Sequence, residues 1–190
     1  MAAKTKPALS WMELDALAPA AVDEAMGRRI VAVYAGAKDL HVRNLCLRLL
    51  YDKRFEVLEG FFEQAFRKER HLDMRVRALR GLAQFRDENA LVGPLAKVSE
   101  SLRKLAVNTP YAYQTYECIL GKDALPYLVA RYGYACLQEA LTLAQANYDA
   151  MPEAFKGHFT IGEDGKPIAL RSPEESQRIL SDFWAAQSAP

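Results

Sequence analysis

The 190-residue chain has little cysteine, and its charge is nearly balanced. Its three cysteines are Cys46, Cys118 and Cys136, and their spacings of 72 and 18 residues fit no metal-binding pattern. Cys46 falls on an apolar helical stripe, which predicts a buried free thiol. Because this cysteine usage is typical of a reducing compartment, we expect a cytoplasmic protein.

Long apolar runs are also missing. No stretch approaches the ~18 uninterrupted apolar residues of a membrane span, so we expect no membrane association. The opening residues, MAAKTKPALSW, have no apolar run after their lysines, and we expect no secretory signal there. The 25 basic residues nearly balance the 24 acidic ones, whereas dedicated nucleic-acid-binding proteins are usually more basic. Apolar residues make up 51% of the chain, enough for the core of one domain over residues 1–190.

The motifs of common enzyme classes do not occur. His41, His71 and His158 are far apart in the sequence, and there is no H-E-x-x-H motif or Cys/His cluster. A G-x-S-x-G motif and a phosphate-binding glycine loop are missing as well. We therefore predict no catalytic, metal-binding or cofactor-binding residue and no cofactor. An enzymatic activity stays open, but a non-enzymatic role is favoured.

Helical periodicity is what the sequence has in abundance. Val42, Leu45, Cys46, Leu49 and Leu50 match the spacing of one helix face, and similar stripes recur within 55–66, 76–83 and 91–105. Short turns between these stripes favour antiparallel neighbours. Further helices are predicted at about 22–35, 109–120 and 123–149, the last with a bend at Gly133. Ser10 and Glu13 form a capping-box pattern.

One phrase is repeated after 34 residues. KDLHVRNLCLRLL and LDMRVRALRGLAQF align so that Asp39 matches Asp73 and Arg43 matches Arg77. At a cap position each Asp would accept first-turn amides. Each Arg then faces the unfavourable end of the helix dipole, which predicts a compensating carboxylate. Asp39 is a candidate partner for Arg77.

These phrases, with ALVGPL and DALPYL further on, resemble HEAT-type helical repeats. The resemblance covers about residues 39–106 and, less closely, 107–149. It implies an all-α fold, a right-handed array of antiparallel helix pairs, in which Asp39, Arg43, Asp73 and Arg77 would form a structural ladder. This chain departs from the family pattern in carrying Cys46 and Arg80 where a small residue is usual, and its third unit has no Val-Arg.

The C-terminal part has a different pattern. In HFTIGEDGKPIAL, apolar and polar residues alternate on both sides of Asp164-Gly165, which predicts a β-hairpin with its turn at these two residues. Ser172 as a cap, followed by Pro173, predicts a helix of about 173–186. We therefore expect a flexible tail at 1–8, a helical array at 9–149 and an appendage at 150–190. The appendage either caps the open end of the array or binds a partner.

Two groups of residues are candidates for partner binding. Seven of the nine tyrosines lie between residues 111 and 148, and seven cations against two acids give residues 67–86 a local charge of +5. Alternatively, the tyrosines fill a helix interface and the cations form a solvated face. The candidate residues are Tyr111, Tyr113, Tyr116, Tyr127, Tyr134, Arg67, Arg70 and Arg80.

Three functions follow from these patterns. The leading hypothesis is a non-enzymatic module that binds a protein partner, as a bacterial adaptor or a toxin-neutralising immunity protein does. Its support is the fold class alone, since helical arrays offer extended binding surfaces. The second is nucleic-acid binding through the Arg67–Arg86 run. Some HEAT-like proteins are DNA glycosylases with a basic concave face, but their pocket residues have no counterpart here. The third is an enzyme or small-ligand binder with a tyrosine-lined pocket.

Overall fold

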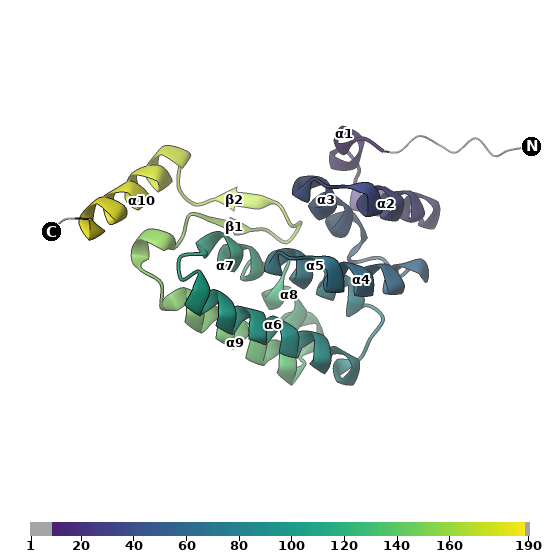
Figure 1. The fold of residues 1–190 in the computed structure, drawn as a ribbon. Coiled ribbons are helices and arrows are strands. Elements are labelled where there is room, and N and C mark those ends of the chain that lie inside the picture. Colours follow the sequence, from purple (N-terminus) through teal and green to yellow (C-terminus); the bar gives the residue numbers. More distant parts are fainter. Residues whose placement is uncertain (1–8, 189–190) are drawn as a thin grey trace, which may run out of the picture. The chain divides into compact units, whose positions relative to one another are not determined.

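The computed structural model describes residues 9–188, and these residues are mostly helical. They form ten α-helices, two 3-10 helices and one two-stranded antiparallel sheet (Figure 1). The helical fold class with a small sheet is therefore confirmed. The flexible tail expected at 1–8 lies outside the described residues. None of the described helices is long and apolar enough to cross a membrane.

The described chain divides into two compact units. Unit 1 contains the residues up to Arg70 and Arg77–Arg86, and unit 2 contains His71–Val76 and the residues from Asp87 onward. The elements of unit 1 are α1 (Trp11–Asp15), η1 (Pro19–Ala21), α2 (Glu24–Gly36), α3 (Leu40–Leu50) and α4 (Val57–Lys68). The expectation of one domain over 1–190 stays a prediction.

The core of unit 1 comes from the predicted stripes. Ser10 caps α1 with the expected capping box, and α3 packs against α1 and α2. The stripe on α3 is buried from Leu45 to Leu50 except at Arg48. Cys46 is a buried free thiol, as expected, and burial raises its pKa to about 12. This thiol stays protonated and unreactive near neutral pH.

The two copies of the repeated phrase begin their helices differently. Asp39 is the N-cap of α3 and accepts the amides of His41 and Val42 at 2.7 and 3.2 Å. Helix α5 (Leu72–Leu82) instead begins before Asp73, which therefore lies in the first turn. The prediction that Asp73 occupies the cap position is thus wrong. A carboxylate in a first turn still favours the helix dipole, so the aspartate keeps a helix-stabilising position without being the cap.

Unit 2 is built around two long helices. Its elements are α6 (Glu88–Asn108), α7 (Tyr113–Ile119), α8 (Leu125–Tyr132), α9 (Ala135–Asp149), η2 (Glu153–Phe155), β1 (Phe159–Ile161), β2 (Pro167–Ala169) and α10 (Pro173–Gln187). Helices α6 and α9 lie side by side (Figure 1) and bury the apolar face of α6. Helix α7 packs on α9 and β1, and α10 packs on η2.

Two helix boundaries differ from the prediction. Helix α7 begins at Tyr113 rather than near 109, because Thr109 ends α6 and Pro110 lies in the following turn. The helix expected over 123–149 is broken at Gly133, which has a positive φ of 65° and ends α8. A left-handed residue stops the i to i−4 hydrogen bonding, so α8 and α9 are separate helices. Asp123 is fully buried just before α8 begins, and Ala124 is the N-cap of that helix.

The C-terminal hairpin and helix form as predicted. Strands β1 and β2 pair in an antiparallel register in which Thr160 lies opposite Ile168. Gly165 takes the positive φ that its turn requires, and Pro167 lies on β2, an edge strand of the two-stranded sheet. The side chain of Ser172 caps α10 by accepting the amide of Glu175.

Candidate functional site

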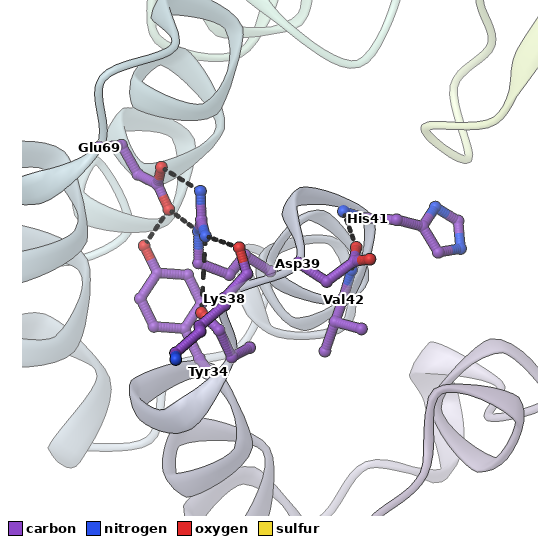
Figure 2. A network of polar contacts seen from close by, with 8 residues as sticks. Tyr34, Lys38, Asp39, His41, Val42 and Glu69 are labelled. Atoms are coloured by element: carbon purple, nitrogen blue, oxygen red, sulfur yellow. Dashed lines mark hydrogen bonds and ion pairs between the residues drawn. The ribbon is translucent and has the colours of Figure 1, made fainter.

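Arg43 of unit 1 has the compensating carboxylate that the repeat predicted. Its Nε donates to Oε1 of Glu69 at 2.8 Å, and Nη2 donates to Oε2 at 3.3 Å. Figure 2 shows the Tyr34 hydroxyl pointing at the same carboxylate, to which it donates at 2.5 Å. Arg43 also donates to the carbonyl of Lys38 at 2.9 Å. This network ties the end of α4 to α2 and α3, so these groups are already engaged within the unit.

The contacts among Arg43, Glu69 and Tyr34 change the acidity of the tyrosine. Burial, reinforced by the neighbouring Glu69 carboxylate, raises the pKa of the Tyr34 hydroxyl. The phenol therefore stays neutral and remains a hydrogen-bond donor to Glu69. The repeat pattern does not point to Glu69, which lies outside both copies of the phrase. The wider ladder of Asp39, Arg43, Asp73 and Arg77 stays a prediction, with Arg77 buried at 3% exposure.

Several arginines of the basic run are engaged by carboxylates. Arg80, a candidate partner-binding residue, is 3% exposed; it donates to Asp52 at 3.0 and 2.6 Å and lies 3.8 Å above the Tyr51 ring. Arg86 donates to Glu59 at 3.0 Å and to Glu63 at 2.7 Å. These contacts leave less positive charge open to a partner than the sequence count of +5 suggests.

The other candidate cations lie at the surface. Arg67 is exposed but pairs with Glu63 one turn before it, and Arg70 is exposed. Within unit 2, Arg75 donates to the Ser101 hydroxyl at 2.9 Å, and burial lowers its pKa. The run is therefore a mixture of buried, paired and exposed cations.

An aromatic cluster lies near the C-terminal helix of unit 2. Tyr111 stacks on Phe155 of η2 with ring centroids 4.6 Å apart, and it meets Phe183 and Trp184 of α10 edge to face. Phe155 is 4% exposed, whereas Tyr111 is 39% and Trp184 48% exposed. We call Tyr111, Phe155, Phe183 and Trp184 the aromatic surface. It presents two large rings to solvent above a buried one.

The remaining candidate tyrosines have separate positions. Tyr113 is half-buried and packs its ring on Phe155 and His158. Tyr134 is half-buried beside Tyr132, with centroids 5.5 Å apart, and Tyr127 is half-buried on α8. Tyr116 is fully buried. The structure thus brings Tyr111 and Tyr113 together around Phe155, while Tyr127 and Tyr134 belong to other contacts.

A buried carboxylate holds the start of the hairpin. Glu117 of α7 is 5% exposed; its Oε1 accepts the Tyr148 hydroxyl and the His158 amide, both at 2.8 Å, and its Oε2 accepts the Phe159 amide at 3.1 Å. Burial raises the pKa of Tyr148 to about 12. The carboxylate is occupied by structural donors, so this cluster positions β1 and offers no free general base.

A cavity of about 300 Å³ opens between the end of α6, α7 and the end of α9. Its walls are Ala106, Pro110, Tyr111, Tyr116, Asn147, Ala150, Met151 and Pro152. Tyr111 therefore belongs to both this cavity and the aromatic surface. Over residues 9–188 no group of three or more His, Cys, Asp or Glu side chains is placed to hold a metal ion.

Comparison of the chain with protein-family models, with curated proteins and with solved structures finds no match.

Sequence reasoning missed Glu117, Phe155 and the cavity. Glu117 left one signal: it is an acid within the apolar stretch YECIL of a helix, where a carboxylate needs a buried donor. No sequence pattern marked Phe155, because η2 is only three residues long and too short to show a helical repeat of apolar residues.

Proposed function

We propose that the chain is a non-enzymatic interaction module that binds a protein partner through the aromatic surface. The observation that carries the proposal is the exposure of Tyr111 and Trp184 above the buried Phe155. Tyrosine and tryptophan dominate binding hot spots, because a rigid ring buries much area and loses little entropy. Four rings that support one another also reduce the ordering cost of association.

The charge around this surface indicates the chemistry of the partner. Residues 149–188 carry seven acids and four bases. Glu153 lies on η2 and Asp182 on α10, two of the three segments that form the aromatic surface, and their side chains are 89% and 70% exposed, each beside one cation of its own segment, Lys156 or Arg178. We infer a partner that places an apolar side chain on Tyr111 and Trp184 and surrounds it with Lys or Arg. Such charges would speed the encounter more than they would raise affinity.

For the fold we propose a HEAT-like right-handed array of helix pairs, with the 150–190 segment as its cap. The Arg43–Glu69 pair, which joins one helix to the end of the next, supports this proposal. An experimental structure in solution tests it. The role as a bacterial adaptor or a toxin-neutralising immunity protein depends on the partner's identity.

Site-specific photocrosslinking in the native host tests the interaction. A benzoylphenylalanine placed at position 184 should crosslink one protein strongly, whereas the same probe at position 11 should not. Trp11 is a matched control because it is 54% exposed but lies in α1 of unit 1.

Calorimetry with the purified crosslinked partner then gives the energetics. Trp184→Ala should weaken binding by about tenfold or more, as expected for a hot spot, and Trp11→Ala should have little effect. Equal effects of the two substitutions would refute the assignment of the surface. Crosslinking between two copies of the chain would identify self-association instead.

Nucleic-acid binding through residues 67–86 has less support. Arg80 and Arg86 are bonded to carboxylates, and phosphate contacts need accessible cations.

A further inference from the structure

The cavity of unit 2 lies where two helices end. Ala106 belongs to the last turn of α6, Asn147 belongs to the last turn of α9, and Ala150 is the C-cap of α9; all three line the cavity. A helix C-terminus carries about half a negative charge, because its last carbonyls have no amide partner within the helix. Two such ends beside one cavity favour a positively charged group there.

Two carbonyls at these helix ends lack a donor. In a continuing helix the Ala106 carbonyl would accept the amide of residue 110, but Pro110 has no N–H. No other backbone amide of the described chain donates to Ala106, and the Asn147 carbonyl is also without one, because Met151 donates to Tyr148 instead. Ala106, Pro110 and Asn147 all line the cavity, so hydrogen-bond acceptors in need of a donor lie at its wall.

An aromatic ring forms another part of the wall. Tyr111 lines the cavity and is 39% exposed, so its ring is accessible. A guanidinium group is flat and stacks on such rings, and its five N–H donors can reach several carbonyls at once. None of the described lining residues is charged, so no cation of the wall opposes this group. The volume of about 300 Å³ is at the lower end of the range for ligand pockets and suits one large side chain.

The chain itself already places a cation on a C-terminal carbonyl of α9. Lys156 donates through Nζ to the Asp149 carbonyl at 2.9 Å and to the Glu153 carboxylate at 2.7 Å. The end of α9 is thus met by an ammonium whose charge Glu153 balances. In contrast, the last turn of α6 has no basic residue. The end of α6 is therefore the one that a cation from outside would complement.

We propose that the cavity of unit 2 binds the guanidinium group of an arginine side chain, which donates to the Ala106 carbonyl and stacks on Tyr111. The arginine belongs to the protein partner, so this proposal rests on the proposed function for its source. It identifies one of the cations that surround the partner's apolar side chain. Trp184 does not line the cavity and contacts the apolar side chain alone.

The arginine site can be tested without the partner. N-acetyl-arginine amide carries a guanidinium on an uncharged backbone, and N-acetyl-citrulline amide is its nearly isosteric neutral control. Met151 lines the cavity, so its labelled methyl group reports binding by NMR, and Met12 in unit 1, which is 62% exposed, is the reference. The Met151 methyl should shift with a Kd of about 5 mM for the arginine amide, and the citrulline amide should bind about tenfold more weakly or less.

Pro110→Ala tests the role of the carbonyl. The substitution supplies the amide that Ala106 lacks, so the Kd of the arginine amide should rise about tenfold. Pro94→Ala is the matched control, because Pro94 lies in the same helix but does not line the cavity, and its Kd should stay within about twofold of the original value. Tyr111→Leu removes the stacking face and should raise the Kd about fivefold.

Trp184→Ala separates the arginine site from the proposed function. It should leave the Kd of the arginine amide within about twofold, although it weakens binding of the partner. If the probe binds as expected and no partner is captured at position 184, the proposed function fails and the arginine site stands. If a partner is captured but the arginine amide does not bind, only the arginine site fails.

Three results would overturn the proposal. One is the lack of a saturable Met151 shift with the arginine amide up to about 50 mM, ten times the expected Kd. Another is equal binding of the citrulline amide, which would remove the need for a cation. The last is an arginine amide Kd that is unchanged in both Pro110→Ala and Tyr111→Leu, which would place the probe elsewhere.

Discussion

Arg43 and Glu69 are joined by two hydrogen bonds of 2.8 and 3.3 Å, and the Glu69 side chain is only 4% exposed. The arginine side chain is 21% exposed, so the pair is largely shielded from water. Removing one member leaves the other desolvated and unpaired. This contact is what compensates Arg43 for its place near the start of a helix.

Arg43→Ala should therefore reduce the free energy of unfolding by about 3 kcal/mol, because Glu69 keeps the Tyr34 hydroxyl but loses its cation. Urea denaturation measures this loss. Arg28→Ala is the matched control: its pair with Glu24 lies on an exposed helix face, and its loss should cost less than about 0.5 kcal/mol. Similar losses of unfolding free energy in the two variants would show that the Arg43–Glu69 pair stabilises the fold no more than an exposed ion pair does.

Arg77 is expected to be structural. It is buried in α5 at 3% exposure, so truncation removes packed methylenes as well as a guanidinium. We expect Arg77→Ala to cost about 1–3 kcal/mol in thermal or chemical unfolding. Arg67→Ala serves as comparison, since the Arg67 side chain is 69% exposed. A loss for Arg77→Ala below about 0.5 kcal/mol, the range of ordinary surface changes, would contradict the structural role.

The basic run is expected not to bind nucleic acid tightly. Duplex and single-stranded DNA titrated at about 0.15 M salt should give no sub-micromolar binding, because much of the charge is already neutralised by carboxylates. Fluorescence anisotropy measures this. Tight binding that weakens steeply with salt, and that is reduced by Arg70→Ala, would restore the nucleic-acid hypothesis.

Two C-terminal truncations should differ sharply. Deleting residues 172–190 removes α10, which has no buried residue, and should cost less than about 2 kcal/mol while exposing Phe155. Deleting 158–190 also removes Ile161 and two amides that Glu117 binds, and should cost more than about 3 kcal/mol. Differential scanning calorimetry compares the two. If the longer deletion melts like the full chain, the hairpin is not part of the folded core.

Gly133 and Gly60 should respond to alanine with opposite signs. Gly133 has a positive φ, so Gly133→Ala should destabilise by about 1 kcal/mol. Gly60 lies within α4 with open space around it, and Gly60→Ala should stabilise by about 0.5–1 kcal/mol. Chemical denaturation of both variants checks this. A neutral result at Gly133 would mean that the break between α8 and α9 is not fixed by its backbone.

The local features of this protein were determined by its sequence. The apolar stripes, the caps at Ser10, Asp39 and Ser172 and the Gly165 turn are all where short-range chemistry places them. These features depend on residues within about four positions of one another, so periodicity and capping rules suffice. The same rules misplaced the cap at Asp73 and joined α8 to α9, because neither boundary is marked strongly enough.

Tertiary structure decided the pairings and the candidate sites. The partner of Arg43 lies 26 residues away and the amides held by Glu117 lie 41 and 42 residues away. The aromatic surface joins rings from the turn before α7, from η2 and from α10. Each ring or charge is compatible with many partners until packing excludes water and selects one, so a pattern along the chain cannot name the pair.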